Sequence, residues 1–135
     1  MTPEMKVLSR RVIAHHQWRC VLGMKVFPIM ADDSVQDVTG TVVGFYETMP
    51  LVYWPDLRET RAHHPREHLL PDLTDPATLG ALLALVREVW GRPGICLYSI
   101  EVNGDLRWGW DGNVDASVTF ATEAEALIVI LEAVS

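Results

Sequence analysis

The chain has 135 residues, of which 49% are hydrophobic and 21% are charged, a composition that predicts one globular domain, residues 1–135, rather than a disordered segment. Eighteen acidic residues against 11 lysines and arginines give a net charge of −7, so we exclude duplex nucleic acid as a partner. No apolar run is long enough to span a membrane, and the N-terminus lacks a signal-peptide core. We therefore expect a cytoplasmic protein with no membrane partner.

The first helix is expected from about Pro3 to His15. Thr2 is a good N-cap residue, and Pro3 suits the first helical position because its missing N–H would be unpaired there anyway. Apolar residues at Met5, Leu8 and Val12 lie on one face of such a helix.

Extended segments are expected next. Residues 17–21 (QWRCV) and 24–30 alternate imperfectly, and Pro28 interrupts the second of them. Residues 41–47 (TVVGFYE) and 51–54 (LVYW) are rich in β-branched and aromatic side chains, which predicts two strands that pair as a hairpin.

The stretch from Leu57 to Leu69 is rich in cationic and imidazole side chains, and we expect a surface loop or a short helix cut by Pro65. Arginine holds phosphate through two parallel hydrogen bonds and histidine can add further ones, so the stretch could bind an anion. A metal site is an alternative because His64 and His68 are four residues apart, but Pro65 and the lack of nearby cysteine disfavour it, and we assign no metal ligand. A solvent-exposed loop with no specific role is the third interpretation. The candidate ligand-binding residues here are Arg58, Arg61, His63, His64, Arg66 and His68.

A central apolar helix is predicted after Asp75, which can cap it, with Pro76 at its first position and Gly91 at its end. Its apolar face repeats with helical spacing. The interior Gly80 costs about 1 kcal/mol relative to alanine, and we expect another backbone to approach closely there. The apolar face comprises Leu79, Leu82, Leu83, Val86, Val89 and Trp90.

The C-terminal region predicts a three-stranded antiparallel meander followed by a helix. The strands are expected at residues 95–102, 106–110 and 116–121, with turns at Asn103-Gly104 and at residues 111–113. Thr122 and Glu125 form a capping box for a helix that runs to the C-terminus. The expected fold class is therefore α+β: an antiparallel sheet, built from this meander and the N-terminal strands, with three helices packed mainly on one face.

Aromatic and cysteine residues complete the candidate list. Trp108 and Trp110 would point to one face of their strand, where two indoles could stack on bases or pack in the core, and Gly109 would leave space for a ligand or a backbone on the other face. Trp54 precedes the Arg/His stretch and is a further candidate for stacking. Cys20 and Cys96 are expected to be reduced, buried thiols.

Three segments resemble a group of small proteins encoded by tailed phages and prophages. They are LPDLTDPATLGALLALVREVWG (70–91), ATEAEALIVILEA (121–133) and Trp18-Arg19, and the first two cover about a quarter of the chain. The resemblance implies a phage origin and a two-part α+β scaffold. The group has no assigned activity, so the resemblance supplies no catalytic residues.

No nucleotide-binding, hydrolase or zinc-ribbon motif is present, so we assign no catalytic residue and no cofactor. The first hypothesis is a non-enzymatic phage protein that sequesters a host-derived nucleotide-like molecule in the host cytoplasm to block a defence signal. The second is a protein–protein inhibitor that docks through its acidic half, and the third is an enzyme that depends on histidine or metal. We also expect a homo-oligomer, because the apolar helices can leave a hydrophobic face to cover. The acidic residues of the second hypothesis are Asp105, Asp111, Asp115, Glu123 and Glu125.

Overall fold

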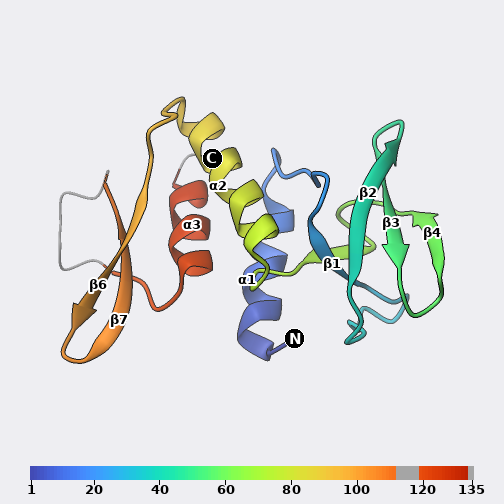
Figure 1. Ribbon diagram of the computed structural model, residues 1–135, viewed down its shortest axis with the longest axis horizontal. Helices are drawn as coiled ribbons and strands as arrows, with labels where there is room; N and C mark the ends of the chain where they lie inside the picture. The colour runs from blue at the N-terminus through green and yellow to red at the C-terminus, as the bar shows by residue number, and fades with distance from the viewer. Residues whose placement is uncertain (112–118, 134–135) are drawn as a thin grey trace. The chain divides into compact units, whose positions relative to one another are not determined.

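The structure is a computed structural model, of which residues 1–111 and 119–133 are described. The described residues form three helices together with antiparallel sheets, which confirms the α+β class (Figure 1). The chain divides into two compact units, Met1–Ala81 and Leu82–Ser135, hereafter the N-terminal and C-terminal units. That the two units make one domain stays a prediction. Within the described part of the chain, no helix is long and apolar enough to cross a bilayer.

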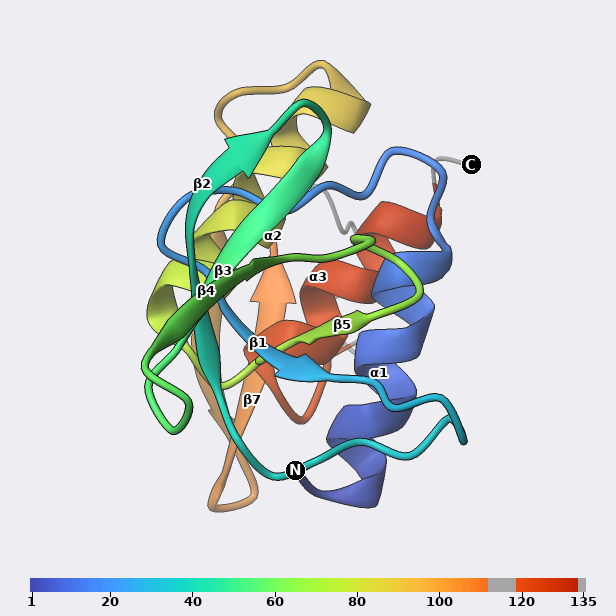
Figure 2. The ribbon, with the colours of Figure 1, turned by 90° about the vertical axis from the view of Figure 1, so that its right-hand side faces the viewer.

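The N-terminal unit is a five-stranded antiparallel sheet with the strand order β4-β3-β2-β1-β5. Helix α1 (Pro3–Ala14) runs beside the edge strand β5, as Figure 2 shows, and the buried Ser9 hydroxyl donates to the carbonyl of Pro71 at 2.9 Å. The Thr2 side chain accepts from the amide of Met5, which confirms the predicted cap. The strands are β1 (Lys25–Pro28), β2 (Gly40–Tyr46), β3 (Met49–Trp54), β4 (Glu59–Ala62) and β5 (Leu69–Pro71).

The hairpin of β2 and β3 is confirmed, but two other predictions for this unit are wrong. Residues 17–21 form no strand, although Trp18 and Cys20 are buried. The Arg/His stretch is neither a simple loop nor a helix, because Glu59–Ala62 pairs with β3 along its whole length. Charged residues have low strand propensity, but an edge strand exposes them to solvent and gains the hydrogen bonds of its neighbour.

The C-terminal unit contains β6 (Leu97–Val102), β7 (Asp105–Trp110) and α3 (Glu123–Glu132). β6 and β7 form a hairpin through Asn103-Gly104, whose φ angles of 53° and 87° match the left-handed turn expected for this dipeptide. The described residues give a two-stranded sheet instead of the predicted three-stranded meander. An isolated bridge joins Trp108 to Phe120, and residues 112–118, which hold Asp115, most of the second turn and half of the third strand, lie outside the described residues.

Helix α3 begins as predicted, with the Thr122 hydroxyl accepting from the amide of Glu125 at 3.1 Å. The indole N–H of Trp90, the last residue of α2 (Pro76–Trp90), donates to the carbonyl of Ile130 at 2.9 Å, and its ring meets that of Trp110 edge to face at 5.2 Å between centroids. Trp110 is therefore a packing residue of this unit. The buried face of α3 consists of Ala124, Ala126, Leu127, Ile128, Ile130 and Leu131.

Gly109 and the cysteines differ from the predictions made for them. The space above Gly109 is filled by the ring of Tyr98, which would lie 2.9 Å from an added Cβ, so neither a ligand nor a backbone is needed to explain this glycine. Both cysteines are free, as predicted, but only Cys20 is buried, and burial raises the pKa of its thiol to about 11. Cys96 is exposed.

The predicted close approach of another backbone at Gly80 is wrong, because a Cβ built there meets no described residue beyond its own helical turn within 4 Å. We expect Gly80→Ala to raise the free energy of unfolding by about 1 kcal/mol, because alanine has a higher helix propensity and restricts the unfolded chain. Urea denaturation followed by circular dichroism measures this change. Destabilisation would mean that the helix is more closely covered at Gly80 than we describe.

Candidate functional site

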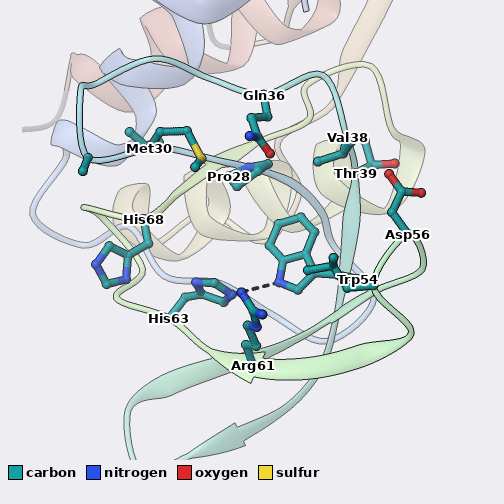
Figure 3. A pocket seen from close by; sticks show the side chains of 13 residues that line it. Pro28, Met30, Gln36, Val38, Thr39, Trp54, Asp56, Arg61, His63 and His68 are labelled. Carbon is teal, nitrogen blue, oxygen red and sulfur yellow. Dashed lines mark hydrogen bonds between the residues drawn. The ribbon is translucent and has the colours of Figure 1, made fainter.

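The N-terminal unit contains a cavity of about 480 Å³, a size typical of small-molecule sites. One wall follows the end of β1 and the segment leading to β2, and the other comes from β3, the turn after it, and β4 with the residues that follow. We call it the Trp54 cavity, because Figure 3 shows Trp54 in its centre, with His68 and Asp56 on opposite sides. It is lined by Pro28, Ile29, Met30, Ala31, Gln36, Val38, Thr39, Trp54, Asp56, Leu57, Arg61, His63 and His68.

Four of the nine predicted ligand-binding residues line this cavity: Trp54, Arg61, His63 and His68. Trp54 ends β3 and pairs with Glu59 of β4, while Arg61 pairs with Val52, so the β3–β4 register fixes both positions. The structure therefore brings together an aromatic residue and three hydrogen-bonding side chains from one short stretch.

Trp54 and His63 are joined by a hydrogen bond. The indole N–H of Trp54 donates to Nε2 of His63 at 2.9 Å, and the rings meet edge to face with centroids 5.4 Å apart. Because Nε2 accepts this bond, it carries no proton, and the neutral His63 ring carries its proton on Nδ1. The pKa of His63 is lowered, first by desolvation and then by the neighbouring His68 and Arg61, which favours this neutral form.

His68 is fixed in a similar way by its own turn. The backbone N–H of His64 donates to Nδ1 of His68 at 2.8 Å, so the neutral ring carries its proton on Nε2. The His63 and His68 rings lie edge to face, 5.9 Å apart. His64, by contrast, accepts from the amides of Arg66 and Glu67 through Nδ1 and does not line the cavity.

These two tautomers decide what the imidazoles can do. A general base needs an unprotonated ring nitrogen that can reach a substrate. In His63 and in His68 the unprotonated nitrogen already accepts a hydrogen bond from the protein, and the other nitrogen carries the proton. Both rings therefore offer hydrogen-bond donors and no free base.

The other polar side chains of the cavity come from both walls. The Nε of Arg61 forms an ion pair with Glu59, which leaves the two terminal nitrogens of its guanidinium without a described protein partner. Asp56, Gln36 and Thr39 also line the cavity, and none of the three side chains has a hydrogen bond to another described residue. Polar groups without a protein partner are available to a ligand.

A short loop closes the first wall. Ile29 bridges to Val35, and Arg10 holds the tip of the loop through the carbonyl and the Oδ1 of Asp33, both at 3.1 Å. Asp33 has a φ of 68°, a left-handed conformation that aspartate tolerates better than most residues. Arg10 thus positions the loop that carries Met30 and Gln36 into the cavity wall.

Arg66 binds the backbone of its own unit instead of lining the cavity. Its guanidinium donates to four backbone carbonyls at and beyond the end of α1, those of Ile13, His15, His16 and Trp18, at 2.6, 2.6, 2.8 and 3.1 Å. Helix ends leave carbonyls without a helical partner, and Arg66 supplies their donors. It lines a neighbouring hollow with Arg10 and Asp33 but does not line the Trp54 cavity.

Three further predicted residues lie away from the cavity lining. Arg58 is exposed in the turn after β3, with a φ of 51°. Trp108 and Trp110 belong to β7 in the C-terminal unit. The sequence reasoning missed the wall at residues 28–31 and 36–39, for which the only signal was the polar loop after an interrupted strand.

Among the described residues, no group of three or more His, Cys, Asp or Glu side chains is arranged to hold a metal ion. Comparisons of the chain with known protein families, with curated proteins and with solved structures found no match. A function must therefore be argued from the Trp54 cavity itself.

The lowered pKa of His63 predicts how stability depends on pH. Below the ordinary histidine value of about 6.5, the unfolded chain binds a proton that folded His63 binds less readily. His63 therefore makes the free energy of unfolding fall as the pH drops from about 6.5 towards the folded pKa. Denaturation of the wild type and of His63→Asn across pH 7.5 to 5 checks this, and the same slope in both proteins would contradict it.

Proposed function

We propose that this chain is a non-enzymatic accessory protein of a phage or prophage that binds a host-derived, nucleotide-like small molecule in the Trp54 cavity. One observation carries the proposal: a single cavity of about 480 Å³ combines the indole of Trp54 with the donors of His63, His68 and Arg61. Nucleotides present a flat ring and an anionic group, which such a combination suits.

The composition of the cavity wall supports a small organic ligand. Seven of its thirteen lining residues are apolar, and the six polar side chains have hydrogen-bonding groups left for a ligand, a mixture found in small-molecule sites. The volume suits one compact ligand rather than a nucleic-acid strand, in keeping with the acidic net charge of −7.

The tautomers of His63 and His68 support binding over catalysis. Each ring offers a donor and has its accepting nitrogen occupied, so neither is placed to remove a proton from a substrate. Sequestration needs only that the ligand be held. By binding a host signal, such a protein would lower its free concentration.

Native mass spectrometry of the full chain, purified from host cells with active defence systems, tests this proposal. We expect a bound mass in the range of a nucleotide that is lost in Trp54→Ala. The same spectrum reports the number of subunits and so tests the proposed homo-oligomer. A mass of protein alone, together with no binding of added nucleotides, would contradict sequestration and favour the acidic protein–protein inhibitor.

A further inference from the structure

The edge of the Trp54 cavity formed by His63, His68 and Arg61 presents donors from three side chains. These are Nδ1–H of His63, Nε2–H of His68 and the terminal nitrogens of Arg61. Glu59 binds the Nε of Arg61, and Asp56, the one carboxylate that lines the cavity among the described residues, lies across Trp54 from His68 (Figure 3). Glu59 itself does not line the cavity, so among the described lining residues this edge has no carboxylate of its own.

We propose that this edge holds the phosphate of the bound ligand, with two neutral imidazoles and one guanidinium as donors. The proposal rests on the proposed function and names the group that each side chain recognises. A phosphate monoester offers oxygens with several lone pairs, so it can accept from all three side chains at once. A cationic group offers no acceptor, and a single carbonyl oxygen has only two lone pairs, so either would leave at least one of the three side chains unpaired when the ligand excludes water.

The residues that we assign to the phosphate differ from the arginine cluster that the sequence suggests. Arg66 already donates to four backbone carbonyls, and Arg58 does not line the cavity. Arg61 is thus the one arginine of the cavity lining among the described residues, and the two histidines supply the remaining donors. With the phosphate at this edge, the ring of the ligand lies towards Trp54 and Asp56.

Paired titrations test the proposal. The full chain is titrated by calorimetry with the four common ribonucleoside 5′-monophosphates and with the four matching nucleosides. We expect the best monophosphate to bind at least about tenfold more tightly than its nucleoside, a difference of about 1.4 kcal/mol. Equal affinities would overturn the phosphate assignment and leave the proposed function standing, whereas no binding by any of the eight compounds would contradict the proposed function itself.

Variants of His68 test whether its ring N–H donates a hydrogen bond to the phosphate or whether the residue only lies near it. Glutamine can place an N–H near the position of Nε2 in the His68 ring, so His68→Gln should keep monophosphate affinity within about threefold. His68→Glu places a like charge against the phosphate and should abolish detectable binding. Arg58→Asn is the matched control: it removes a cation from the same hairpin but outside the cavity, and should leave affinity unchanged. Equal losses in His68→Gln and His68→Glu, with both proteins folded by circular dichroism, would overturn the donor role.

Discussion

Arg66→Met is expected to lower the free energy of unfolding by about 3 kcal/mol, the largest loss that we expect from a residue outside the hydrophobic core. The guanidinium donates to the carbonyls of Ile13, His15, His16 and Trp18, and methionine would remove all four bonds, of which those to Ile13, His15 and Trp18 are partly buried. The His15 carbonyl would keep one donor, the amide of Trp18. Charge-assisted bonds to backbone carbonyls are stronger than neutral ones. Urea denaturation of both proteins measures the change.

Arg66→Lys provides the matched control. It keeps the positive charge, but an ammonium group has three donors on one atom and cannot span four carbonyls as a planar guanidinium does. We expect this variant to lose about half as much stability as Arg66→Met. If Arg66→Met were as stable as the wild type, the loop around Arg66 would not be held to the end of α1 as we describe.

Trp54→Ala is expected to cost about 3–5 kcal/mol and to abolish ligand binding. Trp54 is only 5% exposed, pairs in the β3–β4 register and donates to His63, so its loss opens the core and frees the His63 ring. Thermal denaturation with and without nucleotide measures both effects, because a bound ligand raises the melting temperature only if the cavity survives.

Trp54→Phe separates the two roles of this residue. Phenylalanine keeps an aromatic ring in the cavity but removes the N–H, so Nε2 of His63 loses its donor. We expect a loss of about 1–2 kcal/mol and a His63 ring that no longer favours the Nδ1–H tautomer. Nitrogen-15 NMR of the imidazole reads the tautomer. An unchanged tautomer in Trp54→Phe would show that the Trp54 bond does not set it.

Local signals in the sequence predicted the helices and the tight turn well. Thr2, Pro76 and Thr122 mark the starts of helices, and each of these signals depends only on the first turn of its own helix. Asn103-Gly104 closes its hairpin through its own φ angles. Such features depend on neighbours in the chain, so local reasoning is sufficient for them.

Features that depend on distant residues were predicted less well. The β4 strand ETRA has little strand propensity and forms because β3 offers it hydrogen bonds. The position of Arg66 against α1 joins residues about fifty positions apart, and no pattern in the sequence pairs them. The exposure of Cys96 and the position of the Tyr98 ring over Gly109 also depend on tertiary packing.

The candidate site was predicted in part for a similar reason. The composition of residues 57–69 identified Arg61, His63 and His68, because cations and imidazoles are unusual at that density, and Trp54 was a candidate because it precedes this stretch. Which of these residues share a cavity depends on the strand register and on the opposite wall at residues 28–39. No pattern in the sequence predicts that this wall lies opposite them. The indoles of Trp108 and Trp110 have the same chemistry as Trp54 but belong to another unit.

The most direct test of the central claim uses the indole N–H signals of the five tryptophans in the NMR spectrum, assigned with Trp54→Phe. Adding the best-binding nucleoside monophosphate is expected to shift the Trp54 signal, because Trp54 lines the cavity, and to leave Trp108 and Trp110 unchanged. No shift of Trp54 at millimolar nucleotide, or shifts of Trp108 and Trp110 alone, would contradict binding in the Trp54 cavity.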